Sequence, residues 1–449
     1  MQRTHLRWLR PVALLVSGIV LTLSFTLAGC GGSDDDDDVF ISPSPSPSSA
    51  FNPSPTPSPT ASPSSGLTGT VTGRVLAPDG RTAVSDALIY VPSDQTRALS
   101  LRTGAGRAAP EPAITETRTD ANGNFALAGV PAGDTVVKIL KGQWLIKTVV
   151  SVVAGGTATV PVAQTTLPVT GAGAARIAVV VGAFDRMEDV LAKLGLGEVE
   201  NGRLKQGTER FDIYGGPDFN VPGLPQSLGD TNSLVSDAAK LAQYDIVFFN
   251  CGADEGPLEN AAVRQNLRNY VQNGGNLYVT DLAYDYIEQS IPEAIDFFGA
   301  DGVPIGTAEE SGTAEVGASD VASNADVQDD NLRNWLSARG ALRPDGKVRI
   351  EGFLSGWGVI NKAETGGKEW IRGLLVDEEG SRSAHNHRHG KGRSRGRQVS
   401  VGETRTLTVT APFGAGKVLY SSYHTEPSEE QSSELRPQEQ ILAYLVFEL

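Results

Sequence analysis

Two residues near the end of the chain have types suited to acid–base chemistry. His424 and Glu426 stand two positions apart, just after the apolar stretch Gly416–Ser421. An imidazole titrates near neutral pH, and a carboxylate beside it fixes its orientation, which suits a general acid or base. His424 and Glu426 are therefore candidate catalytic residues. The alternative is a polar pair that only supports the structure.

Asp281 is a third candidate because of where it stands. It follows the apolar run Asn276–Thr280 and precedes a helical pattern over 282–289. In open α/β sheets, ligands bind at the carboxyl ends of the strands. Asp281 could act as an acid or base, bind a cation, or cap the following helix by accepting from its N–H groups.

Cys251 is the fourth candidate, and it follows the apolar run 244–250. It could be a nucleophile paired with His424, or a thiol packed in the core, where cysteines are common. Residues next to Cys251 and Asp281 in the sequence could line the opening of the same site. These candidate ligand-binding residues are Gly252, Asp254, Glu255, Tyr284 and Asp285.

The elements that position these residues alternate between strand and helix from residue 176 onward. Apolar runs predict strands at 176–184, 210–216, 244–250 and Asn276–Thr280, and helical spacing predicts helices at 185–194, 234–241, 260–272 and 282–289. Such alternation predicts a mostly parallel sheet in an α/β domain.

These landmarks resemble the class I glutamine amidotransferase-like fold, a flavodoxin-like α/β domain. The resemblance covers residues 176–449, with an insertion at about 301–402 expected to cover or widen the site. It implies that the loop around Cys251 supplies an oxyanion hole. It also implies that Asp281 occupies the nucleophile elbow, the sharp turn between strand and helix, and that His424 and Glu426 are the other two members of a catalytic triad. The family carries a nucleophilic Cys where this chain has Asp281, and a carboxylate cannot form the thioester of glutamine hydrolysis. The resemblance therefore implies a degenerate site.

Residues 68–168 predict an all-β sandwich, because short strands alternate with turns. Asn122-Gly123 predicts a tight hairpin between two extended runs. The pattern of Asp120, Gly123 and Phe125, followed by Val130-Pro131-Ala132-Gly133, resembles the carboxypeptidase regulatory-like domain, a transthyretin-type sandwich with a carbohydrate-binding-like fold. That family is usually non-catalytic, and no site is expected here.

The N-terminus predicts export and a lipid anchor. Residues 1–29 have a basic start and an apolar run, as in a signal peptide. The run ends in Leu27-Ala28-Gly29-Cys30, which resembles a bacterial lipobox. The resemblance implies an acylated (palmitate-type) Cys30 and membrane attachment through that lipid. Gly31 favours the outer membrane of a Gram-negative cell. Residues 30–67 are acidic and then Pro/Ser-rich, which predicts a disordered stalk.

The composition of the chain limits the kinds of partner that it can bind. The formal net charge of -15 disfavours binding to nucleic acid. Of the 2 cysteines, a lipidated Cys30 would leave Cys251 without a disulfide partner. A segment at 381–397 alternates His385, His387 and His389 among Arg and Lys residues. The three imidazoles suit a transition metal, but the surrounding charge opposes a cation, so a disordered basic loop is the better interpretation. The sequence predicts no metal site and no cofactor.

Three functions follow from these patterns. The leading hypothesis is a cell-envelope lipoprotein with a non-catalytic or degenerate amidotransferase-like binding module, its partner a glycan or an envelope protein. The second is an envelope hydrolase of glycan or peptide that uses His424 and Glu426 with Cys251 or Asp281. The third is a structural lipoprotein whose sandwich docks a partner complex.

Overall fold

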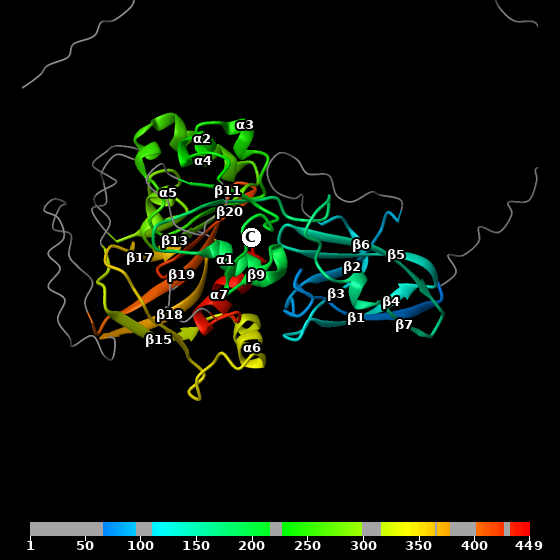
Figure 1. Ribbon diagram of the computed structural model, residues 1–449. Coiled ribbons are helices and arrows are strands. Elements are labelled where there is room, and N and C mark those ends of the chain that lie inside the picture. The colour runs from blue at the N-terminus through cyan, green and yellow to red at the C-terminus, as the bar shows by residue number, and fades with distance from the viewer. Residues whose placement is uncertain are drawn as a thin grey trace, which may run out of the picture. The chain divides into compact units, whose positions relative to one another are not determined.

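The computed structural model describes residues 66–95, 110–215, 227–298, 316–363, 366–377, 401–425 and 432–449 (Figure 1). Cys30, the stalk, the 381–397 segment and Glu426 lie outside these residues. Within the described ranges, no helix combines the length and apolar character that a membrane span requires.

The first folded part is a β-sandwich of a 3-stranded sheet in the order β4-β1-β7 and a 4-stranded sheet in the order β3-β2-β5-β6. Figure 1 shows these strands gathered together in blue to green. Their bounds are β1 Thr68–Arg74, β2 Leu88–Pro92, β3 Ala113–Arg118, β4 Asn124–Pro131, β5 Gly133–Lys141, β6 Trp144–Val152 and β7 Thr157–Thr159.

The predicted hairpin at Asn122-Gly123 is wrong, although the turn itself forms. Asp120 Oδ1 accepts hydrogen bonds from the backbone N–H groups of Asn122 and Asn124 at 2.9 and 2.8 Å, and Gly123 has φ +78°. However, β3 pairs with β2 and β4 pairs with β1, so the turn crosses from one sheet to the other. Phe125 is buried in the core between the sheets, as its position in the pattern suggested.

The second folded part is built on an 11-stranded sheet whose first strands lie in the order β11-β8-β12-β13-β20. These strands pair in parallel. Numbered along the chain, this order is 2-1-3-4-5, the flavodoxin-like order of a doubly wound α/β domain. The bounds are β8 Ile177–Val180, β11 Asp212–Tyr214, β12 Ile246–Phe249, β13 Asn276–Thr280 and β20 Gly416–Ser421.

Strands within the predicted insertion at about 301–402, together with β14 just before it and β19 just after it, extend this sheet. β19 pairs antiparallel with β20, β18 with β19, and β15 with both β18 and β16. The predicted helix in this region forms as α6, Asp330–Ala338, with Leu332, Trp335 and Leu336 buried. The strand bounds are β14 Ile295–Phe297, β15 Val321–Val327, β16 Val348–Ile350, β17 Ile360–Ala363, β18 Lys368–Asp377 and β19 Thr404–Phe413.

The helices differ from the prediction at one break. The helix expected over 234–241 is two short helices, α2 Thr231–Val235 and α3 Ala238–Leu241. Asp237 separates them, because its carboxylate accepts hydrogen bonds from Ala239 N and Lys240 N and so caps α3. The others are η1 Val162–Gln164, α1 Met187–Leu191, η2 Ala192–Leu196, η3 Gly256–Glu259, α4 Ala261–Gln272, η4 Asp281–Tyr284, α5 Asp285–Glu288 and α7 Pro437–Val446; β9 Val199–Glu200 and β10 Arg203–Leu204 form a small separate ladder.

Both faces of the large sheet are covered, which explains the continuous apolar strands. In β12, Ile246 and Phe248 belong to one hydrophobic cluster, and Val247 and Phe249 belong to the other. The alternation follows from the two-residue period of a strand. The polar residues that follow these apolar strands therefore gather at the carboxyl edge of the sheet.

Candidate functional site

Asp281 stands at a sharp turn at the carboxyl end of β13. Its φ is +47°, a left-handed backbone conformation that is uncommon outside glycine. The turn leads directly into η4 and α5. The hydroxyl of Tyr420 donates to the carbonyl oxygen of Asp281 at 3.0 Å and so holds the turn in place. Strained backbone of this kind clusters at functional sites.

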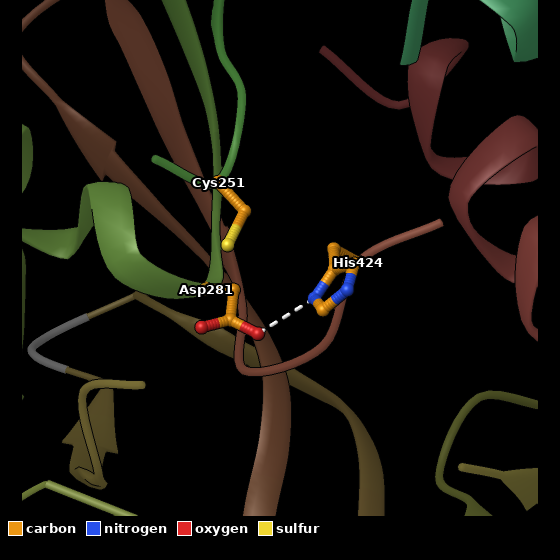
Figure 2. Close-up of side chains that lie close together, drawn as sticks. All are labelled: Cys251, Asp281 and His424. Atoms are coloured by element: carbon orange, nitrogen blue, oxygen red, sulfur yellow. Dashed lines mark hydrogen bonds and ion pairs between the residues drawn. The ribbon is translucent and has the colours of Figure 1, made fainter. Parts of the chain in front are cut away.

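The carboxylate of Asp281 points toward His424. Oδ2 lies 2.7 Å from Nδ1 of His424, and Figure 2 shows this contact as a dashed line. Oδ1 is buried and has no hydrogen-bond partner among the described residues. Neither carboxylate oxygen therefore accepts a hydrogen bond from the helix that follows. The helix-cap hypothesis for Asp281 is therefore wrong, because the imidazole takes the place of the helix N–H groups as partner.

His424 follows β20, and its backbone is held on both sides. Gln438 Nε2 donates to the carbonyl oxygen of His424 at 2.9 Å, and the next residue, Thr425, donates its N–H to Asp185 Oδ1 at 2.9 Å. Glu426, the partner suggested by sequence spacing, lies outside the described residues. Among the described residues, the carboxylate of Asp281 contacts the imidazole.

Cys251 completes the cluster from the end of β12. Figure 2 shows its sulfur pointing toward the Asp281 carboxylate. One donor atom from each of Cys251, Asp281 and His424 lies within 4.8 Å of the other two. The exposed fractions of the three residues are 0%, 0% and 3%. Three of the sequence-predicted candidates thus converge, but at a buried point.

Burial shifts the pKa of both Cys251 and Asp281 upward. Burial raises the pKa of the Cys251 thiol well above its ordinary value, and the negative charge of Asp281 adds to the rise. Burial also raises the pKa of Asp281, while the hydrogen bond to His424 opposes this rise. Cys251 is therefore a protonated thiol at neutral pH and a weak nucleophile.

A second row of polar residues supports the cluster, and Asp185 is its centre. Asp185 accepts hydrogen bonds from Thr280 Oγ1 at 2.5 Å and from Arg186 N at 2.7 Å, in addition to the bond from Thr425. Thr280 Oγ1 in turn accepts from Cys251 N at 2.9 Å. Asp185 therefore ties together the ends of four neighbouring strands.

Sequence reasoning missed Asp185, although a usable signal was present. Asp185 follows a buried apolar strand, as Asp281 and Cys251 do. Close by, Asn250 Nδ2 donates to Glu188 Oε2 at 3.0 Å, and both residues are buried. Burial raises the pKa of Glu188 to about 8, while Arg186 opposes the rise.

The residues predicted to line the opening of the site fall into a buried group and a partly exposed group. Tyr284 and Asp285 are buried, and the Tyr284 ring packs on Phe297 with centroids 5.7 Å apart. Gly252, Asp254 and Glu255 are partly exposed in the loop after Cys251. The hydroxyl of Tyr286 donates to the Asp254 carbonyl and fixes that loop.

Gly252 has a specific steric role in the same loop. Its φ is +79°, and a Cβ there would lie 2.8 Å from the Phe184 ring and 3.1 Å from Ala183 N. The chain can therefore pass close to the end of β8 only with glycine at this position. This constraint helps to hold Cys251 beside Asp281.

Comparison with known proteins finds similarity to solved structures at low identity. A scan against protein-family models finds no match, and a search of curated proteins finds none either. Among solved structures, the chain is similar to a cytoplasmic protein from Salmonella typhimurium, with 9% identity, a TM-score of 0.31, and coverage of 60% of this chain and 97% of that one.

Two further solved structures match similar fractions of this chain. A second cytoplasmic protein from Salmonella typhimurium LT2 has 12% identity and a TM-score of 0.28, covering 61% of this chain and 99% of that one. A protein from Bacteroides uniformis described as thua-like has 9% identity and a TM-score of 0.31, covering 60% of this chain and 89% of that one. The strand order 2-1-3-4-5 identifies the flavodoxin-like α/β domain without reference to these solved structures.

Proposed function

We propose that this chain is a cell-envelope lipoprotein whose amidotransferase-like domain binds a ligand without hydrolysing it. The observation that carries this proposal is the Asp281 carboxylate at the φ +47° turn, hydrogen-bonded to His424. In the family that the chain resembles, this turn presents a sulfur nucleophile. A carboxylate there cannot form a thioester with glutamine.

Cys251 does not replace the missing nucleophile in this account. Its thiol is buried, and its pKa is raised by burial and by the charge of Asp281. A nucleophilic cysteine needs the opposite environment, in which a nearby positive charge or a helix N-terminus lowers its pKa. The domain thus keeps the scaffold of a catalytic site without an activated nucleophile.

Assay of glutamine hydrolysis by the full chain tests this proposal. We expect no ammonia release above the level of the His424→Ala variant, since neither Asp281 nor Cys251 can carry the acyl group. Ammonia release by the unmodified chain that disappears in His424→Ala would overturn the proposal.

The envelope location is proposed from the lipobox at Leu27-Ala28-Gly29-Cys30. A Cys30→Ser variant should lose lipid labelling and membrane association in cell fractions, because acyl chains anchor a protein through burial of their CH₂ groups. Cys251→Ser is the matched control and should fractionate like the unmodified chain. Membrane association that survives Cys30→Ser would count against the anchor.

One observation favours a second function, hydrolysis of a glycan or peptide. A carboxylate at a strained turn with an imidazole in contact could act as a nucleophile or as an acid–base pair. A panel of glycan and peptide substrates tests this, with Asp281→Asn and His424→Ala as variants. Activity that both variants abolish would support hydrolysis over binding.

A further inference from the structure

Three different donor atoms face one another where β12, β13 and β20 end. They are the sulfur of Cys251, a carboxylate oxygen of Asp281 and a ring nitrogen of His424, all within 4.8 Å of one another. Figure 2 shows the three side chains turned toward a common point. The residues lie far apart along the chain, which is why sequence spacing predicted no metal there.

The donor set has the chemistry of a zinc ligand shell. Zn²⁺ binds Cys sulfur at about 2.3 Å, His nitrogen at about 2.0–2.1 Å and carboxylate oxygen at about 2.0–2.2 Å, usually in a tetrahedral arrangement. Donors around such an ion lie roughly 3.3–3.7 Å apart. The side chains would need shifts of about 1 Å to reach this geometry. Mg²⁺ and Ca²⁺ fit less well, because both require several oxygen donors and neither favours sulfur.

Asp281 gives an independent reason to expect a cation. Its Oδ1 atom is buried and has no hydrogen-bond partner among the residues that the structure describes. An unsatisfied buried carboxylate oxygen is costly. The second buried carboxylate, Asp185, adds negative charge to the same region, and Arg186 nearby also forms an ion pair with Asp189. A divalent cation would satisfy Oδ1 and offset this charge.

The backbone around each donor is already fixed. Cys251 N donates to Thr280 Oγ1, Thr280 donates to Asp185, and Gln438 Nε2 donates to the His424 carbonyl. Outer partners of this kind orient metal ligands and support affinity. The Tyr420 hydroxyl holds the Asp281 carbonyl in the same way. Binding of an ion would therefore require movement of side chains more than of the chain.

We propose that Cys251, Asp281 and His424 hold one Zn²⁺ ion, with a fourth position left for water or a ligand. Three protein ligands with an open position are the usual arrangement of a reactive zinc site. On binding, the ion replaces the thiol proton of Cys251, which leaves to solvent, and the ring proton of His424 moves to Nε2, so that the neutral imidazole and the carboxylate both bind the ion. This inference goes beyond the proposed function and is independent of glutamine hydrolysis.

Cobalt titration tests the site directly. The full chain carrying Cys30→Ser, in which Cys251 is the remaining thiol, is stripped with EDTA and titrated with Co²⁺ and then with Zn²⁺. We expect one equivalent of Co²⁺ to give a sulfur-to-cobalt charge-transfer band and tetrahedral visible bands, which one equivalent of Zn²⁺ removes. Cys251→Ser should abolish the charge-transfer band, and His424→Ala should weaken binding at least about tenfold.

Substitutions at Asp281 separate a metal ligand from a structural residue. Asn tolerates the left-handed φ and can still accept a hydrogen bond from His424, so Asp281→Asn should stay folded but bind Co²⁺ at least about tenfold more weakly. Asp281→Cys supplies a second sulfur donor and should retain binding with a stronger charge-transfer band. Circular dichroism in EDTA checks that each variant is folded.

The histidines at 385, 387 and 389 provide the necessary control. Replacing all three with Gln should leave the cobalt spectrum unchanged. Loss of the spectrum in that triple variant, or a charge-transfer band that survives Cys251→Ser, would overturn the proposal. The absence of any band at stoichiometric Co²⁺ would overturn it equally.

Discussion

His424 Nδ1 lies 2.7 Å from Asp281 Oδ2, although 143 positions separate the two residues along the chain. The register of the sheet explains this contact. β13 and β20 are parallel neighbours in which Thr280 stands beside Ser421. Asp281 follows directly, and His424 is reached after one short turn. The contact is therefore built on two rigid strands, which are better supports for a site than mobile loops.

The backbone at Asp281 predicts an ordered response to substitution. Asp281→Asn should change the free energy of unfolding by less than about 1 kcal/mol, because Asn tolerates positive φ and keeps an acceptor for His424. Asp281→Val should cost about 2–4 kcal/mol, because a β-branched residue is strained at φ +47° and cannot accept the hydrogen bond. Urea unfolding measures both. Equal stability of the two variants would show that neither the turn nor the imidazole contact constrains this position.

The thiol of Cys251 should react slowly in the folded protein. It is buried, and its pKa is raised, so both access and the thiolate fraction are low. With Cys30→Ser as background, we expect iodoacetamide to label Cys251 at least about a hundredfold more slowly in buffer than in denaturant. His424→Ala should not slow the reaction further. Rapid labelling that depends on His424 would instead support Cys251 as a nucleophile.

Glu188 should make stability depend on pH. Burial raises its pKa to about 8 in the folded chain, from an ordinary value of 4.5. Between these values the folded state holds a proton that the unfolded state has lost, so stability falls as pH rises from about 4.5 to about 8. The slope from this group is at most roughly 1.4 kcal/mol per pH unit.

Comparison of two Gln variants measures this effect. Glu188→Gln should flatten the decline in the free energy of unfolding over that pH range, because Gln stays neutral and can still accept from Asn250. Glu198→Gln alters an exposed pair with Lys205 and should leave the decline unchanged. A decline of the same slope in Glu188→Gln would assign the pH dependence to another group.

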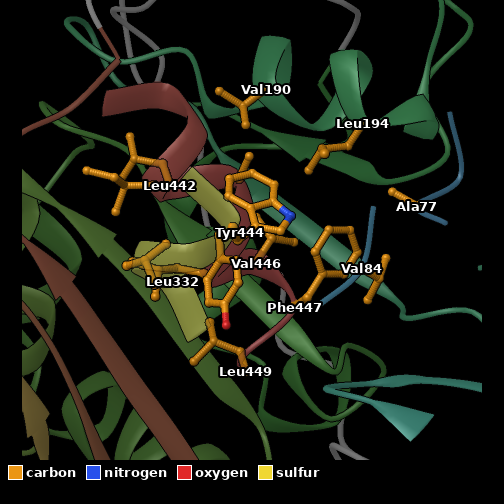
Figure 3. Packing of buried hydrophobic residues seen from close by; sticks show 14 of the residues in the cluster. Ala77, Val84, Val190, Leu194, Leu332, Leu442, Tyr444, Val446, Phe447 and Leu449 are labelled. Atoms are coloured by element: carbon orange, nitrogen blue, oxygen red, sulfur yellow. The ribbon is translucent and has the colours of Figure 1, made fainter. Parts of the chain in front are cut away.

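The β-sandwich and the α/β domain should unfold together, because they share one hydrophobic cluster. Figure 3 shows Val84 of the sandwich beside Phe447, and Ala77 near Leu194. Trp335 Nε1 of α6 also donates to the Ala83 carbonyl at 2.8 Å. Calorimetry should therefore give one transition for the unmodified chain.

Loss of this contact should weaken the coupling. Trp335→Phe should lower stability by about 1–2 kcal/mol by leaving the Ala83 carbonyl unpaired, and Trp335→Ala should separate the transition into two. Trp357→Phe is the matched control, because its indole bonds Ala318 within the α/β domain. Trp357→Phe should lower stability without dividing the transition. A single transition retained in Trp335→Ala would contradict this coupling.

Sequence patterns predicted the parallel part of the sheet well, because buried parallel strands are continuous apolar runs such as 244–250 and Asn276–Thr280. They also predicted the convergence of Cys251, Asp281 and His424, because all three follow such strands. They did not predict which residue contacts which. The hairpin at Asn122-Gly123 failed because turn residues fix the local chain direction, while the sheet that each strand joins depends on distant partners.

Two features near the site could not be predicted from local patterns. The register of β13 and β20 brings Asp281 to the imidazole of His424, whereas the predicted pairing of His424 with Glu426 lies outside the described residues and stays a prediction. Helical spacing predicted a single helix over 234–241, but the carboxylate of Asp237 caps a second helix that begins there. Burial of the three side chains depends on the whole fold, so no local pattern reports it.

A crystal structure of the full chain tests the central claim most directly, through the separation of Asp281 Oδ2 and His424 Nδ1 and the φ of Asp281. We predict a hydrogen-bonded pair, or both side chains bound to one ion, with a positive φ at Asp281 in either case. Side chains on opposite faces of the sheet, or a helical φ at Asp281, would contradict the claim that a carboxylate stands at the position of a sulfur nucleophile.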